Sequence, residues 1–204
     1  MKQQILHQYK SRRNCVRLIK TADGVFVQKT YQQEHAYLQE KLIYRKLQGT
    51  EIPRAEVIST KDQMLLLSLL PGKNLVEILE HQESTGVVEW IVWEKLVIWL
   101  VDFYHLTGHI MTDVNLRNFL YDAPMQTLYG LDFEGCTQGD PVFMASLLAA
   151  YIRTYAPQNT SLKLEIAEYV LRRFSGECSV ELQTLFLETQ KQEALLERRR
   201  KSRT

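Results

Sequence analysis

The first third of the chain alternates short apolar segments with turn residues, a pattern typical of antiparallel β-strands. β-branched and aromatic residues dominate Cys15–Thr21 and Val25–Tyr31, and the Asp-Gly pair between these segments is a strong hairpin signal. A short polar turn likewise separates Glu56–Thr60 from Met64–Leu70. The pattern therefore predicts two antiparallel hairpins in this part of the chain.

A helix is predicted between the two hairpins. Gln32–Leu47 contains no glycine or proline, and its apolar residues recur at the spacing of one helix face. Glu40 shares that face with Ala36, Ile43 and Tyr44. A carboxylate on a buried face is unfavourable unless a cation meets it, so the pattern predicts a cationic partner for Glu40.

The Pro71-Gly72 pair is the clearest break in the chain, and the pattern beyond it is mainly helical. The predicted helices are Asn74–Leu79, Val88–Thr107, Val142–Tyr155, Leu162–Phe174 and Val180–Arg199, and the predicted short strands are His109–Thr112, Phe119–Tyr121 and Leu128–Leu131. Strands followed by helices favour an α+β fold with two lobes. We expect a small antiparallel β-rich lobe at residues 1–70 and a helical lobe at 71–204.

Composition limits the cellular setting and the partners. The 204 residues carry a formal net charge of +1, so no global field attracts nucleic acid or a membrane surface. Cys15, Cys136 and Cys178 have no metal-site or disulfide spacing, which favours a reducing compartment. The apolar stretch Trp90–Leu106 contains charged residues and indicates a buried helix, not a membrane span. Because the first residues lack a signal-peptide core, we expect a cytoplasmic protein.

Three polar residues in the middle of the chain point to phosphate chemistry. Asp113 and Asn118 share one predicted loop, and Asp132 follows an apolar strand and precedes Phe133. A loop carboxylate can orient or deprotonate a hydroxyl, and Asp and Asn oxygens are ligands that suit Mg²⁺. Taken singly, Asp113 and Asn118 also fit ordinary turn roles. Their order with Asp132 favours phosphoryl transfer, which needs mainly positioned charge and metal ligands.

Lys29 supplies the positive charge that such a site requires. It ends a predicted strand on the same face as Val25 and Val27. It is either a solvated edge residue or a cleft residue that pairs with Glu40. Glu34 is the alternative partner, but it lies near the predicted helix start, where a negative charge already favours the helix dipole.

These residues and the strings around them resemble the kinase-like superfamily, most closely its branch of aminoglycoside phosphotransferases and choline kinases. The strings that carry the resemblance are Leu65-Leu-Leu-Ser-Leu-Leu-Pro71-Gly72-Lys-Asn-Leu75 (hinge), Phe103-Tyr-His-Leu-Thr-Gly108 (helix end), Met111-Thr-Asp113-Val-Asn-Leu-Arg-Asn118-Phe-Leu120 (catalytic loop) and Leu131-Asp132-Phe-Glu134 (metal segment). The resemblance implies a two-lobed, protein-kinase-like fold that uses ATP and Mg²⁺.

The resemblance also implies a role for each matching residue. Asp113 would be the catalytic base, and Asn118 and Asp132 would bind Mg²⁺. Lys29, held by Glu40, would contact the ATP phosphates. The implied adenine contacts are backbone groups of Ser68 and Leu70, with the side chains of Val27 and Leu120 on either side of the ring.

Three features depart from the family pattern. The segment Lys10-Ser-Arg-Arg-Asn14, where a phosphate-covering loop is implied, contains no glycine, so backbone amides cannot approach phosphates freely. Arg12 and Arg13 either contact phosphate with their side chains or are solvated. Met111 replaces the loop histidine. The short path from Asp132 to the next helix leaves no activation segment, which speaks against a eukaryotic-type protein kinase.

Several functions stay open on this basis. The first is transfer of the γ-phosphoryl group of ATP to a hydroxyl of a small molecule. A compact atypical protein kinase of the RIO-like type, with a protein as substrate, is an alternative. A third is a catalytically weak kinase-fold regulator that holds nucleotide or nothing, and nucleotidyl transfer on the same fold is a fourth. We interpret Tyr151 and Tyr155 as helix-packing residues and not as substrate contacts.

Overall fold

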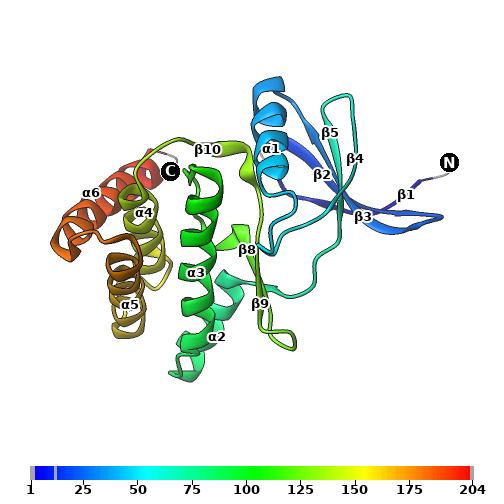
Figure 1. Ribbon diagram of the computed structural model, residues 1–204. Coiled ribbons are helices and arrows are strands. Elements are labelled where there is room, and N and C mark those ends of the chain that lie inside the picture. Colours follow the sequence, from blue (N-terminus) through cyan, green and yellow to red (C-terminus); the bar gives the residue numbers. More distant parts are fainter. Residues whose placement is uncertain (1–2, 12, 203–204) are drawn as a thin grey trace.

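The computed structural model describes residues 3–11 and 13–202. The strands of its largest sheet are β1 (Gln4–Tyr9), β2 (Asn14–Thr21), β3 (Gly24–Tyr31), β4 (Val57–Lys61) and β5 (Met64–Ser68). The helices are α1 (Glu34–Lys46), α2 (Leu75–Thr85), α3 (Trp90–Thr107), α4 (Pro141–Thr154), α5 (Ser161–Cys178) and α6 (Leu182–Lys201). Figure 1 shows the sheet at one end of the molecule and α4, α5 and α6 at the other, with α3 between them. The predicted α+β class is confirmed.

The sheet is antiparallel, with the strand order β1-β2-β3-β5-β4. Both predicted hairpins, β2-β3 and β4-β5, are present. Strand β1 was not predicted, because it contains a single β-branched residue, Ile5, and no Asp-Gly pair or comparable turn signal separates it from β2. It pairs with β2 and extends the sheet by one edge strand.

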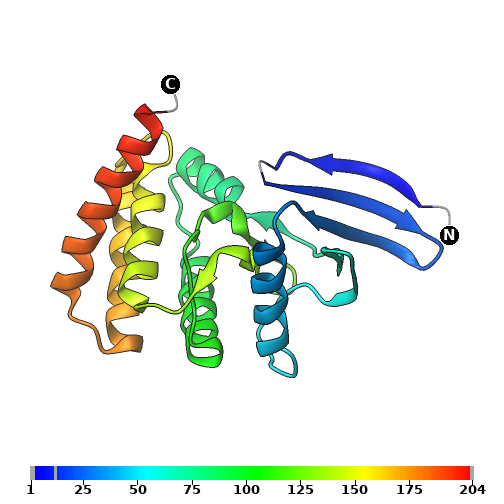
Figure 2. The same ribbon diagram turned by 90° about the horizontal axis from the view of Figure 1, so that it is seen from above.

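Helix α1 lies between the sheet and the other helices (Figure 2). Its buried residues are Ala36, Tyr37, Glu40, Ile43 and Tyr44, which is the face that the spacing predicts. Glu40 is thus the one carboxylate on a face that otherwise packs apolar and aromatic groups. This position requires compensation of its charge inside the protein.

The Pro71-Gly72 break leads into a small sheet beneath α2. Strand β6 (Lys73–Asn74) pairs with β8 (Phe119–Asp122), which pairs in turn with β9 (Thr127–Gly130). Gly72 has a φ of 106°, and a side chain there would overlap the backbone of Tyr121, so this passage requires glycine. The Asn74 side chain accepts hydrogen bonds from the N–H groups of Val76 and Glu77 and caps α2.

Helix α2 is longer than predicted. It continues past Leu79 to Thr85 and ends at Gly86, whose φ of 70° provides a left-handed cap. The extra turns are held by Gln82, which is fully buried and accepts a 3.0 Å hydrogen bond from the indole of Trp93. Because Gln82 is polar, it did not extend the apolar pattern of the helix, and the predicted helix therefore ended too early.

Helix α3 is buried along most of its length and forms the centre of the helical part. Two further short strands, β7 (Ile110–Met111) and β10 (Cys136–Thr137), pair beside it. No helix among the described residues is both long enough and apolar enough to cross a membrane. The buried residues of α3 belong to the hydrophobic core, as the sequence pattern of Trp90–Leu106 predicted.

Candidate active site

The predicted pair of Lys29 and Glu40 is present. Lys29 is buried on β3, and its Nζ donates a 2.6 Å hydrogen bond to the Oε2 of Glu40 on α1. The Lys29 side chain is 8% exposed and that of Glu40 is 1% exposed. Glu34, the alternative partner, is exposed in the first turn of α1. The structure therefore assigns the helix register in which Glu40 is the partner.

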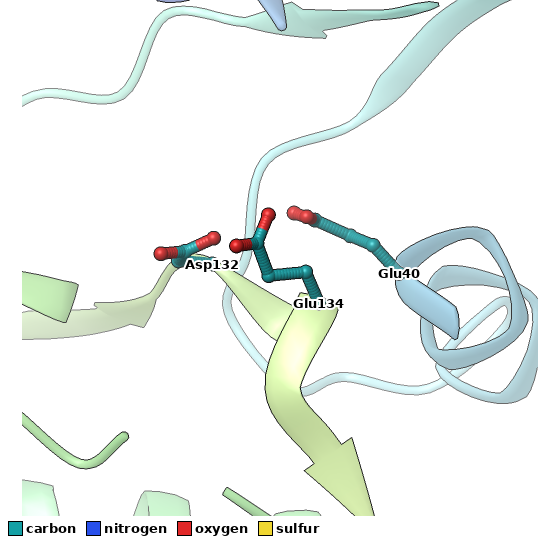
Figure 3. Close-up of side chains that lie close together, drawn as sticks. All are labelled: Glu40, Asp132 and Glu134. Carbon is teal, nitrogen blue, oxygen red and sulfur yellow. The ribbon is translucent and has the colours of Figure 1, made fainter. Parts of the chain in front are cut away.

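Two more carboxylates reach the same ammonium group from the chain that follows β9. Lys29 Nζ also contacts Oδ1 of Asp132, and it lies 3.3 Å from Oε2 of Glu134. Figure 3 shows Glu40 approaching from α1 and the other two side chains from the segment 132–134. Ligand oxygens of the three acidic residues all lie within 4.8 Å of one another. The strand β3, the helix α1 that follows it and the distant segment 132–134 thus meet at one point.

Burial and the neighbouring charges shift the pKa values of Lys29 and Glu40 in this cluster. Burial by itself lowers the pKa of Lys29, but the charges of Glu40, Asp132 and Glu134 outweigh it, so that pKa lies above its ordinary value. Lys29 is therefore fully charged near neutral pH. Burial raises the pKa of Glu40, although the Lys29 charge opposes this shift. The cluster thus places three acidic side chains around one ammonium group, with the exposed guanidinium of Arg13 4.0 Å from Glu134 at its edge.

Phe133 anchors the loop that carries Asp132. Its ring is fully buried and packs against Trp99 and Phe103 of α3, with ring centroids 6.1 and 5.7 Å away. It also meets Tyr44 of α1 edge-on at 5.2 Å. One aromatic side chain therefore ties the loop to the two helices on either side.

Asp132 itself adopts a left-handed backbone conformation, with φ 61° and ψ 67°. Such a conformation is uncommon for a residue other than glycine, although Asp tolerates it better than most. The preceding residue, Leu131, donates its N–H to the backbone oxygen of Asn118 at 2.8 Å. Asp132 and Asn118, both predicted as metal ligands, are thereby held on neighbouring pieces of backbone.

The loop after β7 brings Asp113 and Asn118 together. The side-chain amide of Asn118 donates a 2.9 Å hydrogen bond to the backbone oxygen of Asp113. Asp113 remains exposed, yet partial burial raises the pKa of its carboxyl group, and the Asp132 charge raises it further. A carboxylate with a raised pKa and access to solvent is suited to accept a proton.

Two tyrosines of the fourth helix region contact this loop. The hydroxyl of Tyr151 donates a 3.2 Å hydrogen bond to Oδ1 of Asp113, and that of Tyr155 donates a 2.6 Å hydrogen bond to Oδ1 of Asn115. The guanidinium of Arg117 lies 5.6 Å from the centre of the Tyr155 ring. The sequence interpretation assigned both tyrosines to helix packing and missed these contacts. The signal in the sequence was their spacing of four residues, which places both tyrosines on the same face of the helix.

The residues implied in adenine binding are half-buried: Val27, Ser68, Leu70 and Leu120. Val27 lies opposite Leu67 in the β3-β5 ladder. The N–H of Ser68 donates to the backbone oxygen of Glu56 at 2.9 Å, so that group is already occupied. Leu120 lies on β8, opposite Asn74 and Tyr129. Their role in nucleotide binding stays a prediction.

The glycine-free segment connects β1 and β2. Asn14 is buried at its end, and its side-chain amide donates to Glu134. The guanidinium of Arg13 lies 4.0 Å from Glu134 and is 80% exposed, while Arg12 lies outside the described residues. The sequence interpretation included neither Glu134 nor Asn14 among the site residues. The signal for Glu134 was its place at the end of the string Leu131-Asp132-Phe-Glu134, two positions after Asp132.

Neither a known family model nor a curated protein matches this sequence. The case for a function therefore rests on the residues and their geometry.

Proposed function

We propose that the chain is an ATP- and Mg²⁺-dependent phosphotransferase with a two-lobed, protein-kinase-like arrangement. The observation that carries the proposal is the convergence of β3, α1 and the segment 132–134 on the ammonium group of Lys29. A buried lysine held by a helix glutamate next to a loop aspartate matches the parts that phosphoryl transfer to and from ATP requires. The antiparallel sheet and the helical part supply the two sides of the proposed cleft.

Lys29 would contact the nucleotide phosphates, and Glu40 would hold it in place. The short Lys29–Glu40 contact and the burial of both side chains fix the ammonium group before a ligand arrives. Preorganised charge of this kind stabilises a transferring phosphoryl group without the cost of reorienting solvent.

Asp113 would act on the acceptor. Its carboxylate takes the proton of the acceptor hydroxyl as that oxygen forms its bond to the γ-phosphorus and the bond from phosphorus to the bridging oxygen of ADP breaks. The raised pKa of Asp113 favours this acceptance. The hydrogen bond from Tyr151 fixes the carboxylate orientation, and Asn118 fixes the backbone that carries it.

The donor set agrees in type with a magnesium ion. Asp132, Glu134 and the amide oxygen of Asn118 are hard oxygen donors, which Mg²⁺ prefers. Held there, Mg²⁺ would supply positive charge that offsets the negative charge of the phosphate groups. Asp132 contacts Lys29 directly, so its carboxylate would have to interact with both the lysine and the ion.

The acceptor is proposed to be a hydroxylated small molecule. After Asp132 the chain forms the 3₁₀ turn η2 (Phe133–Gly135) and β10 and then enters α4, which leaves no long segment to hold a peptide. Binding is tested by thermal shift with ATP, with and without Mg²⁺, and turnover by ADP release against a panel of small alcohols and amino sugars. Absence of both a shift and turnover would refute the proposal.

A regulator that binds nucleotide without turning it over is the second candidate. Two observations favour it. Lys29 is already engaged by three carboxylates, and the segment that would cover the phosphates has no glycine. An ATP-induced thermal shift without ADP release on any acceptor would support this candidate over the first.

A further inference from the structure

A cavity lined partly by basic side chains lies beside α1. Its volume is about 320 Å³, and it is formed between the C-terminal half of α1 and the chain that leads into β4. The basic residues that line it are Lys41, Arg45 and Arg54. Lys41 and Arg45 follow each other by one helical turn, next to the stripe that carries Glu40 and Tyr44.

The charges of this cavity are not balanced. Glu56 is the single acidic residue in its lining, so one negative charge faces three positive ones. Among the residues that the structure describes, none forms an ion pair with Lys41, Arg45 or Arg54. Like charges one turn apart disfavour the helix, and three cations around one cavity repel one another.

Structural roles account for part of this set. Arg45 lies in the last turn of α1, where a positive charge favours the helix dipole. Lys41 donates to the hydroxyl of Tyr37 at 3.2 Å, and Arg54 donates to the backbone oxygen of Ile52 at 2.8 Å. These contacts place the three side chains, but they use neutral acceptors and leave the excess positive charge uncompensated. Burial also lowers the pKa of Arg54, which indicates that its guanidinium is partly withdrawn from water.

We propose that this cavity binds a small phosphate-bearing molecule. Its volume falls at the lower end of the range for small-molecule sites, which suits a phosphate monoester better than a folded partner. Arginine side chains bind phosphate oxygens through paired N–H groups, and Lys41 adds a point charge. Tyr44, Ala55, Val57 and Leu65 complete the lining with apolar surface for the remainder of the ligand.

Such a ligand would act on the candidate active site through α1. A phosphate group held by Lys41 and Arg45 on one side and Arg54 on the other would fasten α1 to the segment before β4. Glu40 lies on the same helix and holds Lys29, so the position of the lysine would become dependent on the second ligand. This regulatory part rests on the proposed function, whereas the binding itself does not.

Titration calorimetry with inorganic phosphate tests the binding, in magnesium-free buffer at constant ionic strength. We expect saturable binding that Arg45→Ala and Lys41→Ala each weaken by about tenfold or more. Lys20→Ala removes an exposed cation of β2 outside the cavity lining and should leave the affinity unchanged.

Two outcomes would overturn the proposal. One is the absence of saturable phosphate binding at millimolar concentrations, and the other is an equal loss of affinity in Lys20→Ala. Arg45 is exposed, so its replacement does not endanger the fold. Because neither ATP nor turnover is measured, failure of the proposed catalytic function would not alter the result.

Discussion

Lys29 and Glu40 form a buried ion pair across the boundary between β3 and α1, with 2.6 Å between Nζ and Oε2. Each charge occupies a site from which water is largely excluded, so each depends on the other. Asp132 and Glu134 approach the lysine from the outer side, and the Asp132 side chain is 40% exposed. Glu40 is therefore the member of the cluster whose charge is least screened by solvent.

Replacing Glu40 with alanine should destabilise the protein strongly. The change leaves part of the Lys29 charge without its buried partner and opens a cavity beside Tyr44, at an expected cost of about 3–5 kcal/mol in the free energy of unfolding. Urea denaturation followed by circular dichroism measures the loss. Glu34→Ala, on an exposed position of the same helix, is the control and should cost under about 1 kcal/mol. A larger loss for Glu34→Ala would contradict the observed register.

Replacing Asp132 should impair ATP binding, whereas replacing Asp113 should impair turnover. We expect Asp132→Asn to weaken magnesium-dependent ATP binding, since its carboxylate lies beside Lys29 in the proposed phosphate site. Asp113→Asn should retain ATP affinity and lose turnover by roughly 10²–10⁴-fold, the usual contribution of a general base. Equilibrium binding and single-turnover rates separate the two effects. An equal loss of ATP affinity in both variants would rule out this division of roles.

The sequence predicted those strands that combine strand-forming residues with a clear turn signal, and the helix that has a periodic apolar face. The β2-β3 and β4-β5 hairpins and the buried face of α1 are of this kind. Strand β1 has no such turn signal, although it is exposed along its whole length in the same way as the correctly predicted β4. Its pairing with β2 is a backbone property that side-chain periodicity does not encode.

The candidate site was predicted where a charge falls on an apolar background. Glu40 and Lys29 stood out for this reason, and the structure brings them together. Glu134 and Tyr151 did not stand out, since a glutamate in a polar loop and a tyrosine on a helix are common. Only the folding of the segment 132–134 against α1, and of α4 against the Asp113 loop, gives these two residues their contacts.

The rate should depend on pH through the ionisation of Asp113. The hydrogen bond from Tyr151 should determine the pH at which the rate falls. The hydrogen bond from Tyr151 stabilises the ionised carboxylate and lowers the pKa of Asp113, in opposition to burial. Tyr151→Phe removes that bond, so the pKa rises and the acid limb of the kcat/KM profile moves to higher pH. Tyr155→Phe is the control, because that hydroxyl bonds Asn115 instead. A shift toward lower pH in Tyr151→Phe would refute the assignment of Asp113 as the base.

Gly130 should prove essential for the placement of Asp132. A methyl group at position 130 would overlap the indole of Trp99, which is 3% exposed and cannot move aside freely. Gly130→Ala should therefore cost about 1–3 kcal/mol in the free energy of unfolding and reduce ATP affinity through displacement of the loop. Gly176→Ala has open space around it in α5 and should stabilise the protein by about 0.5–1 kcal/mol. Equal thermal stability in the two variants would contradict the packing described.

We predict that the phosphoryl acceptor is a small hydroxylated molecule and not a peptide. A peptide substrate needs an extended docking segment, yet the chain passes from Asp132 to Pro141, the first residue of α4, through one short turn and a two-residue strand. The side of Asp113 toward α4 presents two tyrosine hydroxyls and the guanidinium of Arg117. These polar groups suit a compact hydroxylated molecule, because they can bind several hydroxyl groups at once.

Labelled ATP distinguishes a small acceptor from a protein. We expect label transfer to one class of small alcohol or amino sugar and little transfer to a protein extract. Tyr155→Phe should raise KM for that acceptor while leaving the KM for ATP unchanged, since the Tyr155 hydroxyl bonds Asn115 in the loop that carries Asp113. Efficient labelling of a specific protein, with no turnover of any small molecule, would instead identify a compact protein kinase. The absence of a docking segment after Asp132 would then mean that the protein substrate is recognised as a folded surface, and Arg117 would be the first residue to replace in mapping it.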